Sequence, residues 1–383
     1  MHTTSGRYTL MKKLTVLLLA MLTLLSACST RTEPTVTDNP PSPTEAAAPP
    51  SPTAAPTPAA TPEPIPEPTP EPTPEPTPEP FRNPLTGEIV DEDITGRRPY
   101  AVMLNNINVA MPHCGVSEAD IIYEILVEGT TRMMGLFMDI NDVPSLGSIR
   151  SIRPYFIDIM TTYDAIAVHA GGSEQAYSDI KTKNIDNMDG VRGPGAGAFA
   201  RDPSRQAHGI EHSLFTTGAK VVSASDDLNY RREHNDGFDI GLTFAEDGTP
   251  ADGVLAEEMT VAFGAYKTSS FKYSVTDKLY YMQQYKSDYI DGTTGKAVGF
   301  TNVLVLFADS RITDSYGRWS VNLTGSGKGY FACGGNAAEI TWSRENEGEN
   351  FYYSLSDGTP LDLGVGTSFI CIVPSDSGAV NFS

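Results

Sequence analysis

The chain has 383 residues and a formal net charge of −21, with 27 lysine and arginine residues against 48 aspartate and glutamate residues. Residues 31–80 hold 19 of the 29 prolines, which leaves about 300 residues from 81 onward to fold, enough for one large or two medium domains. This folding part carries a net charge of −17, which argues against DNA or RNA as the main partner because phosphate binding needs a cationic surface.

The N-terminus has the pattern of a secretory signal peptide over residues 1–27. Lys12 and Lys13 precede the mostly apolar residues 14–25, which are too few for a transmembrane helix of about 20 residues. This stretch ends in the letters LSAC, which resemble the bacterial lipoprotein box. The resemblance implies cleavage before Cys28 and lipidation of that cysteine, although an ordinary signal peptide with an incidental cysteine is the alternative. The sequence thus predicts a lipid anchor and a location on the extracytoplasmic face of the bacterial cell membrane.

Residues 28–80 are predicted to begin with the lipidated cysteine and to continue as a disordered, proline-rich stalk. TPEP and IPEP repeats fill residues 61–80, and proline at every second position removes backbone donors that helices and sheets need. An extended polyproline segment rises about 3.1 Å per residue, so that fifty residues reach roughly 150 Å. A spacer is favoured over the alternative, in which the proline motifs bind aromatic grooves of a partner.

Residues 81–240 are predicted to form an α/β domain with a mixed sheet. Strands are expected at residues 98–104, 121–128, 132–138 and 165–168. Helices are expected at 154–163, where Pro154 suits the first helical position, and at 174–183, which Ser173 can cap. Strands that alternate with helices favour a partly parallel sheet.

Residues 257–383 are predicted to form a β-rich domain, a curled antiparallel sheet or half-barrel, which makes the chain α+β overall. From residue 271 onward, strand-like strings with a period of two follow one another: FKYSV, KLYYMQQY, TNVLVLF, RWSVNL, EITW, FYYSL and SFICIV. The segment 236–256, rich in Asp, Gly and Glu, is the expected junction. Cys333 and Cys371 share the β-rich domain, and a disulfide and two buried free thiols are both open interpretations.

The string GSGKG at residues 325–329 contains glycines and a lysine like a phosphate-binding loop. The G-x-x-x-x-G-K-[ST] spacing of such loops is absent, and a strand rather than a helix is expected after it. A glycine hairpin is therefore the favoured interpretation.

Several longer strings occur together along the folding part of the chain: RPYAVMLNN, ADIIYEILVEGTTR, GSIRSIRPYFIDI, YDAIAVHAGGSEQAY, GAFARDPSRQA and LTGSGKGYF. Together they resemble the YerB-like bacterial lipoproteins, a two-domain family of unknown function, over roughly residues 83–375. The resemblance implies the two-domain division and the lipid anchor, and it brings no activity, substrate or catalytic residue. Two positions depart from the family pattern. Asn105 stands where an aspartate is expected, and the family histidine is matched by His212, or by His208, in a loop with extra residues.

Three groups of residues are candidates for chemistry. The first is His169 with Gly171, Gly172 and Ser173, at the end of a predicted strand and the start of a helix. Ligands bind at the carboxyl ends of strands in α/β sheets, and a helix N-terminus offers N–H groups to an anion. The alternative is a tight turn in which His169 is hydrogen-bonded within the wall.

The second group consists of arginines in loops rich in Gly, Pro and Ser: Arg150, Arg153, Arg201 and Arg205. Such arginines suit bidentate binding of a carboxylate or a phosphate, and cell-wall polymers carry both groups. Ion pairs with nearby acids are an equally open interpretation. Because an acidic protein needs a local cationic pocket to hold an anion, we expect one cleft at the C-terminal edge of the first sheet. Its predicted lining is Arg150, Arg153, His169, Arg201 and His212.

The third group is Glu124, Glu128 and Arg132, which are close enough in sequence to meet at one end of the sheet. Two carboxylates could act as acid and base on a glycan, whereas a structural Glu–Arg pair is the favoured interpretation. No metal site is predicted, because the one pair of histidines four residues apart, His208 and His212, stands in a glycine-containing loop. No cofactor is predicted either.

We therefore expect a membrane-anchored extracytoplasmic lipoprotein of unknown biochemical activity, which binds an anionic, envelope-derived ligand through its α/β domain. A cell-wall glycan or peptide hydrolase is one alternative, and a protein–protein adaptor at the cell surface is another. The expected partners are the membrane and a cell-wall polymer or envelope protein, and no nucleic acid.

Overall fold

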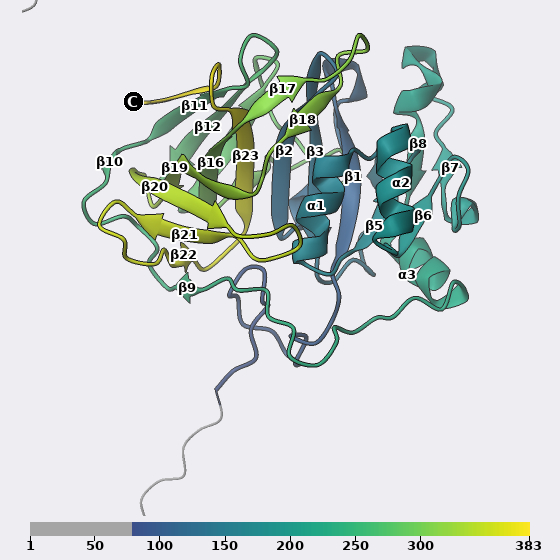
Figure 1. Cartoon of the computed structure of the whole chain (residues 1–383), viewed down its shortest axis with the longest axis horizontal. Coiled ribbons are helices and arrows are strands. Elements are labelled where there is room, and N and C mark those ends of the chain that lie inside the picture. Colours follow the sequence, from purple (N-terminus) through teal and green to yellow (C-terminus); the bar gives the residue numbers. More distant parts are fainter. Residues whose placement is uncertain (1–78) are drawn as a thin grey trace, which may run out of the picture. The chain divides into compact units, whose positions relative to one another are not determined.

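One sheet of eleven strands runs through residues 79–383, the part of the chain that the computed structural model describes (Figure 1). The chain up to residue 240, which we call the first half, supplies β1 (Tyr100–Asn106), β2 (Ile121–Val127), β3 (Thr130–Phe137), β5 (Ile166–His169) and β6 (Asn187–Asp189). The second half supplies β10 (Val254–Leu255), β16 (Asn302–Ala308), β19 (Gly325–Cys333), β20 (Asn336–Arg344), β21 (Tyr352–Leu355) and β23 (Ser368–Pro374). The strand order is β10-β20-β19-β16-β23-β2-β3-β1-β5-β6, and β21 pairs with β20. The predicted signal peptide, Cys28 and all but the last two residues of the predicted stalk lie outside the described residues.

The two halves of the chain meet inside this sheet. β2 pairs in parallel with β23, from Ile121 opposite Ser368 to Ile125 opposite Ile372. On its other edge β2 pairs with β3 in antiparallel fashion, β3 pairs likewise with β1, and β1, β5 and β6 run parallel. Every residue of β2 is buried, as expected of a central strand covered on both faces. The mixed pairing confirms the predicted α+β fold and its mixed sheet.

The α-helices of the described residues all lie in the first half: α1 (Pro154–Thr162), α2 (Glu174–Thr182) and α3 (Gly218–Asp227) (Figure 1). Apolar residues of α1 and α2 belong to the same buried cluster as Met103, whereas Val221 of α3 belongs to the cluster that contains Val102. Successive side chains of a strand point to opposite faces. The helices α1 and α2 therefore cover one face of the sheet, and α3 covers the other.

Both predicted helix starts are confirmed. Pro154 occupies the first helical position of α1, where its missing N–H would have no partner in any case. Ser173 caps α2, because its Oγ accepts a hydrogen bond from the N–H of Ala176 at 3.2 Å. Within residues 79–383, no helix has the length and apolarity that a bilayer crossing requires.

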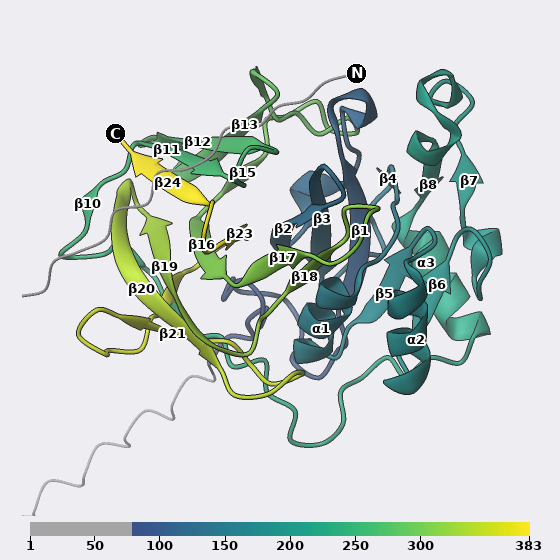
Figure 2. The same cartoon turned by 45° about the horizontal axis from the view of Figure 1, so that its top comes forward.

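A second, antiparallel sheet forms from the second half and packs on the main sheet (Figure 2). Its strands are β11 (Glu258–Ala262), β12 (Thr268–Ser274), β13 (Leu279–Gln284), β14 (Ser287–Asp288), β15 (Gly299–Phe300) and β24 (Ala379–Phe382). The rings of Phe271 and Phe300 lie 5.2 and 5.0 Å from the ring of Phe369 in β23, so aromatic edge-to-face contacts join the two sheets. The second half is β-rich, as predicted.

Short elements complete the described chain. The small sheets pair β17 (Ser310–Ile312) with β18 (Trp319–Val321), β9 (Phe244–Ala245) with β22 (Leu363–Gly364), and β8 (Leu214–Thr216) with both β4 (Leu146–Gly147) and β7 (Ala200–Arg201). The 3-10 helices are η1 (Asn108–Ala110), η2 (Val116–Glu118), η3 (Ala196–Ala198), η4 (Gln206–His208) and η5 (Ile210–His212).

The predicted glycine hairpin at residues 325–329 is wrong, because these residues form the first part of β19. Gly327 lies opposite Trp342 of β20, and a Cβ at position 327 would stand 2.4 Å from the indole Nε1. A Cβ on Gly329 would stand 2.7 Å from the carbonyl oxygen of Val305. These glycines therefore permit close packing within a sheet rather than a turn.

The disulfide interpretation for the second half is also resolved. Cys333 and Cys371 are both buried free thiols. Burial raises the pKa of the Cys333 thiol to about 11, so the group stays protonated and packs as a small apolar side chain.

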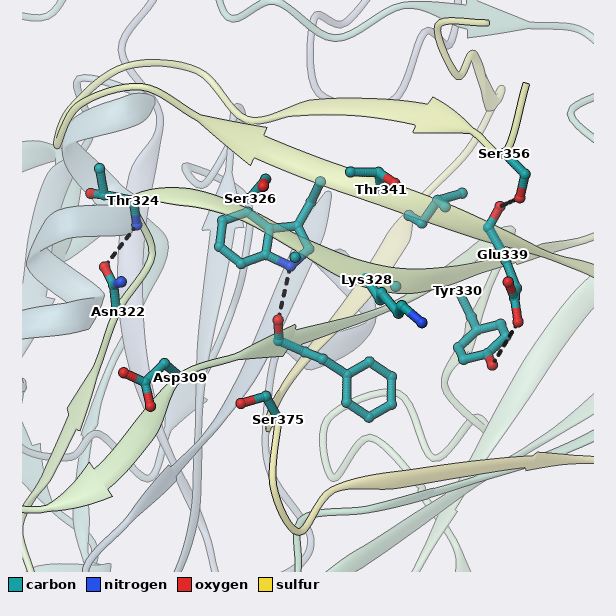
Figure 3. Close-up of a pocket in the computed structure, with 15 residues that line it drawn as sticks. Asp309, Asn322, Thr324, Ser326, Lys328, Tyr330, Glu339, Thr341, Ser356 and Ser375 are labelled. Carbon is teal, nitrogen blue, oxygen red and sulfur yellow. Dashed lines mark hydrogen bonds between the residues drawn. The ribbon is translucent and has the colours of Figure 1, made fainter. Parts of the chain in front are cut away.

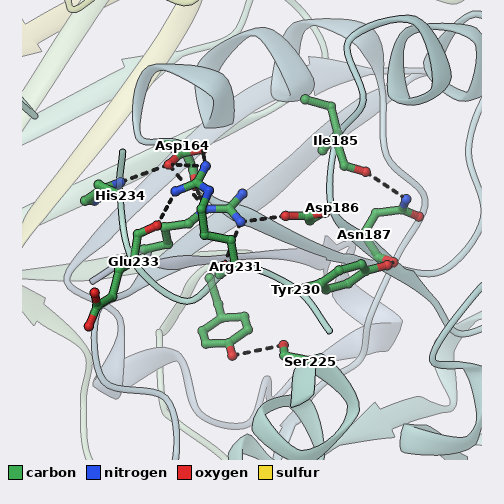
Figure 4. A network of polar contacts seen from close by, with 11 residues as sticks. Asp164, Ile185, Asp186, Asn187, Ser225, Tyr230, Arg231, Glu233 and His234 are labelled. Atoms are coloured by element: carbon green, nitrogen blue, oxygen red, sulfur yellow. Dashed lines mark hydrogen bonds and ion pairs between the residues drawn. The ribbon is translucent and has the colours of Figure 1, made fainter. Parts of the chain in front are cut away.

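A polar network fastens the chain that follows α3 to the amino ends of the parallel strands (Figure 4). Arg98, just before β1, donates to Asp186 at 2.5 Å and to the carbonyl of Asp164 at 2.6 Å. Arg231 and His234 both reach the carboxylate of Asp164, at 2.8 and 3.1 Å. The opposite, carboxyl ends of these strands are thereby left to the loops of the candidate site.

Candidate functional site

The carboxyl ends of the parallel strands β1, β5 and β6 meet at one edge of the main sheet. The segment 149–153, which leads into α1, is drawn to the same edge by two isolated bridges, Leu104 with Ile149 and Ile152 with Gly172. In open α/β sheets, ligands bind in the crevice outside such strand ends. The predicted arginine and glycine loops are therefore next to one another.

A cavity of about 340 Å³ opens at this edge, and we call it the arginine cavity. Three arginines line it: Arg150 before α1, Arg192 after β6 and Arg201 in β7. The other lining residues are Ile149, Ser151, Ala170, Gly171, Gly172, Val191, Ile210, Glu211 and Leu214. Of the predicted site residues, the structure brings Arg150, Gly171, Gly172 and Arg201 together here.

Arg150 is a partly buried arginine of this lining. Its Nε is buried and has no hydrogen-bond partner among the described residues. Burial lowers the pKa of the Arg150 guanidinium; the charge of Glu211 opposes this shift, and that of Arg153 adds to it. A desolvated donor without an acceptor costs free energy. The guanidinium itself lines the cavity, so an anion there would balance its charge, while the buried Nε stays closed to solvent.

Arg132 adds a further positive charge near Arg150. It is buried and donates to the carbonyl of Ser151 at 2.6 Å. Burial, and after it the charges of Arg153 and Arg150, lower the pKa of Arg132 to about 9. Arg132 thus adds positive charge behind the cavity, in a protein whose folding part is strongly acidic. A local positive potential of this kind favours anion binding.

Arg153 does not line the arginine cavity, so the prediction of a single cleft is wrong for this residue. Its Nε and Nη2 donate to the two oxygens of Glu128 at 2.7 and 2.8 Å. Burial opposes the ionisation of Glu128, but these bonds outweigh it and hold its pKa below the ordinary value. Arg153 and Ser173 line a separate cavity of about 520 Å³. Because side chains alternate along extended backbone, positions 150 and 153 face opposite sides of their segment.

The two predicted histidines, His169 and His212, are buried behind the loops at this edge of the sheet and do not line the arginine cavity. His169 is fully buried, with Nδ1 2.9 Å from the carbonyl oxygen of Gly171 and Nε2 3.2 Å from Oδ1 of Asn187. His169 therefore matches the alternative interpretation, in which it is hydrogen-bonded within a tight turn between strand and helix. His212 is buried as well, and its Nδ1 accepts a hydrogen bond from the Asn105 amide at 2.7 Å.

The remaining two loop arginines bind backbone carbonyls. Arg205 donates to the carbonyls of Ala110 and Pro112, both at 2.8 Å, and stays outside the arginine cavity. Arg201 donates to the carbonyl of Ile210, which holds its guanidinium at the rim of the cavity. Neither arginine forms an ion pair with a described residue, so the ion-pair interpretation holds for Arg153 alone of the predicted set.

Glu124 serves the core rather than the site. It is fully buried and accepts hydrogen bonds from the Nζ of Lys267 and the Oγ of Ser269, both at 2.8 Å. With Glu124 bound to Lys267 and Glu128 bound to Arg153, neither the acid–base pair nor a pairing with Arg132 forms. The predicted meeting of these three residues at one site is wrong.

Sequence reasoning missed Arg192 and Glu211. The Nε of Arg192 donates to the hydroxyl of Tyr177 at 2.9 Å, and its guanidinium carbon lies 4.1 Å from the centroid of that ring. Arg192 stands in the string VRGPGAG, a Gly/Pro loop like those of the other arginines, so the same criterion could have found it. Glu211 carries no comparable signal, because it stands among extra residues that depart from the family pattern.

A larger cavity, of about 600 Å³, lies in the second half where β16 and β19 separate (Figure 3). β16 pairs with β19 only as far as Leu306 opposite Gly329, and beyond this point Trp342 donates to the carbonyl of Phe307 at 3.0 Å. The charged lining residues are Asp309, Lys328 and Glu339. Because these charges are mixed, and the described residues leave no buried polar side-chain atom of this lining unpaired, this cavity is the weaker candidate.

The fold and the site define a class of protein: an α+β chain built on one mixed sheet, with a small cationic cavity at the carboxyl ends of its parallel strands. Residues 85–231 match the N-terminal domain, and residues 259–370 the C-terminal domain, of the family described as "Protein of unknown function (DUF3048)". The chain is 30% identical over 295 residues to "Putative lipoprotein YerB" of Bacillus subtilis (strain 168), an alignment that covers 76% of this chain and 85% of that protein. The crystal structure of YerB protein from Bacillus subtilis matches with a TM-score of 0.66 and 26% identity, over 79% of this chain and 99% of that one. The chain therefore belongs to the DUF3048 family, in agreement with the YerB-like resemblance of its sequence.

Proposed function

We propose that this chain is a membrane-anchored extracytoplasmic lipoprotein that binds an anionic group of an envelope-derived ligand in the arginine cavity. The name of the Bacillus subtilis relative supports the lipid anchor, as does the LSAC string that ends at Cys28. A lipid anchor followed by the predicted stalk of residues 28–80 would hold the cavity outside the membrane and within reach of the cell wall, whose polymers and peptides carry carboxylates and phosphates.

Arg150 is the residue on which the binding proposal rests. Arg150 is half-buried, it is close to Arg132 and Arg153, and its Nε has no hydrogen-bond partner in the part of the chain that the structure describes. Such an arginine is unfavourable for the folded protein alone. Arg192 and Arg201 line the same cavity, so one carboxylate or phosphate can accept hydrogen bonds from more than one guanidinium. The arrangement supports anion binding better than a purely structural role.

The two alternative functions have less support. A hydrolase with a carboxylate pair is disfavoured, because Glu124 and Glu128 are bound to different cations and do not share a cavity. An adaptor would be favoured by arginines that are all held in surface ion pairs, whereas the Nε of Arg150 has no partner among the described residues.

Arg150→Gln tests the proposed site. The variant should bind acetate and inorganic phosphate at least about tenfold more weakly, because hydrogen bonds to a charged group contribute about 1.5–3 kcal/mol each. Its melting temperature should be unchanged or higher, because the repulsion with Arg132 and Arg153 is relieved. Calorimetric titration of the detergent-solubilised full chain at constant ionic strength would measure the first effect, and a thermal scan the second.

Arg97→Gln is the matched control, since Arg97 forms an exposed ion pair with Glu92 away from the cavity. This variant should bind both anions like the wild type. Anion affinity that is equal in all three proteins would remove the site. A large fall in the melting temperature of Arg150→Gln would assign Arg150 a structural role instead.

The lipid anchor has its own test. Cys28→Ala should move the protein from the membrane fraction to the soluble fraction, because the acylated thiol would be absent. Fractionation followed by immunoblotting would show the change. A variant of mature length that remains with the membranes would contradict the anchor.

A further inference from the structure

We infer that the group held in the arginine cavity is the C-terminal carboxylate of a peptide whose last residues carry small aliphatic side chains. This inference rests on the proposed anion site and names its ligand class. It follows from the residues of the cavity that are not arginines, namely one carboxylate and an apolar rim.

Glu211 makes the cavity unsuitable for a multiply charged anion. Its side chain lines the cavity and is close enough to Arg150 and Arg201 for their charges to contribute to a lower pKa of its carboxyl group, after a larger effect of hydrogen bonding to its own backbone. A phosphate with two negative charges would be repelled by this ionised carboxylate. A peptide carboxylate carries one charge, and the amide N–H beside it can donate to Glu211.

The rim of the cavity presents apolar surface to solvent. Val191 is 54% exposed and Ile210 is 60% exposed, and both line the cavity. Arg192 and Glu211 line the same cavity, so apolar and charged residues share its lining. A ligand with an anionic end and an adjacent methyl or isopropyl group would cover both kinds of surface, whereas inorganic phosphate would cover only one.

The dimensions and the rigidity of the cavity favour the end of a chain. Its volume of about 340 Å³ is at the small end of ligand pockets, which measure about 300–1,000 Å³. The bond from Arg201 to the carbonyl of Ile210 holds the charged and apolar parts of the rim in a fixed relation. A terminal residue and its neighbour fit this arrangement better than the middle of a polymer.

Calorimetric titration of the detergent-solubilised full chain tests the inference with four probes at constant ionic strength: a dipeptide acid, its amide, inorganic phosphate and acetate. N-acetyl-alanyl-alanine should bind at least about tenfold more tightly than inorganic phosphate. The C-terminal amide of the same dipeptide should bind at least about tenfold more weakly than the acid, because the carboxylate is removed. Glu211→Gln should reduce the preference for the peptide over phosphate. Ile210→Ser should weaken the binding of the dipeptide about fivefold and leave the affinity for acetate unchanged. The control is Ile312→Ser, at an exposed isoleucine of β17, which should change neither affinity.

The outcomes separate the inference from the function on which it rests. Phosphate that binds more tightly than the peptide, with a dependence on Arg150, would overturn the inference and leave the anion site standing. Equal binding of the peptide acid and the peptide amide would also overturn it. If neither anion binds, both the inference and the proposed function are wrong.

Discussion

At the scale of single residues, the contacts that matter most for stability are those that neutralise charged groups in the interior. Glu124 is fully buried in the central strand β2, and Lys267, which neutralises it, comes from the second half of the chain. Ser269 donates to the other carboxylate oxygen, so the charge is hydrogen-bonded as well as paired. Removing one partner of such a pair leaves an uncompensated charge in the core.

Lys267→Met should therefore lower the free energy of unfolding by about 3–5 kcal/mol. Urea unfolding of the variant and the wild type would measure this difference. Lys272→Met is the control, because Lys272 forms an exposed pair with Glu258 and its loss should leave stability nearly unchanged. Equal effects of the two substitutions would show that the buried pair contributes no more than the exposed one.

At the scale of elements, the segment between η1 and β2 carries a histidine into the interior. His113 is fully buried, and its Nδ1 shares a hydrogen bond of 2.6 Å with the hydroxyl of Tyr289. Burial lowers the pKa of His113 to about 3, against about 6.5 in an unfolded chain. As the pH falls from 7 to 5, the unfolded chain takes up a proton at this residue and the folded chain does not. Stability therefore decreases as the pH falls through this range.

His113→Gln should remove this dependence. The difference in unfolding free energy between wild type and variant should shrink by about 2 kcal/mol between pH 7 and pH 5. The comparison needs the variant, because burial raises the pKa of Asp120 to about 6 and this group acts in the opposite direction. His208→Gln, at an exposed position, is the control. Urea unfolding at both pH values would measure the differences, and a constant difference for His113→Gln would contradict the buried neutral imidazole.

The elements also show what a local pattern can predict. The helix starts at Pro154 and Ser173 were predictable, because a proline at the first position and a serine cap act on their own segments. β19 was misinterpreted, because its glycines are explained by Trp342, which lies opposite them on another strand. Arg153 was assigned to the wrong side of its segment, because the prediction considered loop composition and not the alternation of side chains.

At the scale of the whole described chain, the two halves are joined within one sheet and by buried ion pairs. β2 and β23 form the continuous seam. On one face, Arg344 of β20 donates to both oxygens of Asp158 in α1 at 3.0 Å. The two halves match two separate domains of the family, yet their strands belong to one sheet.

The two halves should therefore unfold in a single transition. Circular dichroism at 222 nm reports mainly on α1, α2 and α3 in the first half, whereas tryptophan fluorescence reports on Trp319 and Trp342, the two tryptophans of the chain, in the second half. The two signals should give the same urea midpoint. Separate midpoints would show that the halves are independent domains.

The seam was beyond prediction from this sequence alone. Ile121 and Ser368 are far apart along the chain, and the apolar strings of β2 and β23 would suit any central strand. In the same way, Glu124 was visible as a carboxylate in a strand, but nothing near it pointed to Lys267. By contrast, Arg150 and Arg201 were expected to share a cleft, because parallel strands bring their following loops to one edge of the sheet.

The most direct test of the arginine cavity is the NMR signal of the Arg150 Nε–H group during titration of the full chain with acetate. The signal can be assigned by its absence from the Arg150→Gln variant. Nε is a buried donor without a partner among residues 79–383, and it belongs to a guanidinium that lines the cavity. An anion bound beside this guanidinium should therefore shift the Nε–H signal with saturation, while that of Arg97 stays in place. An Arg150 signal that does not move at acetate concentrations where binding is saturated would contradict anion binding in the arginine cavity.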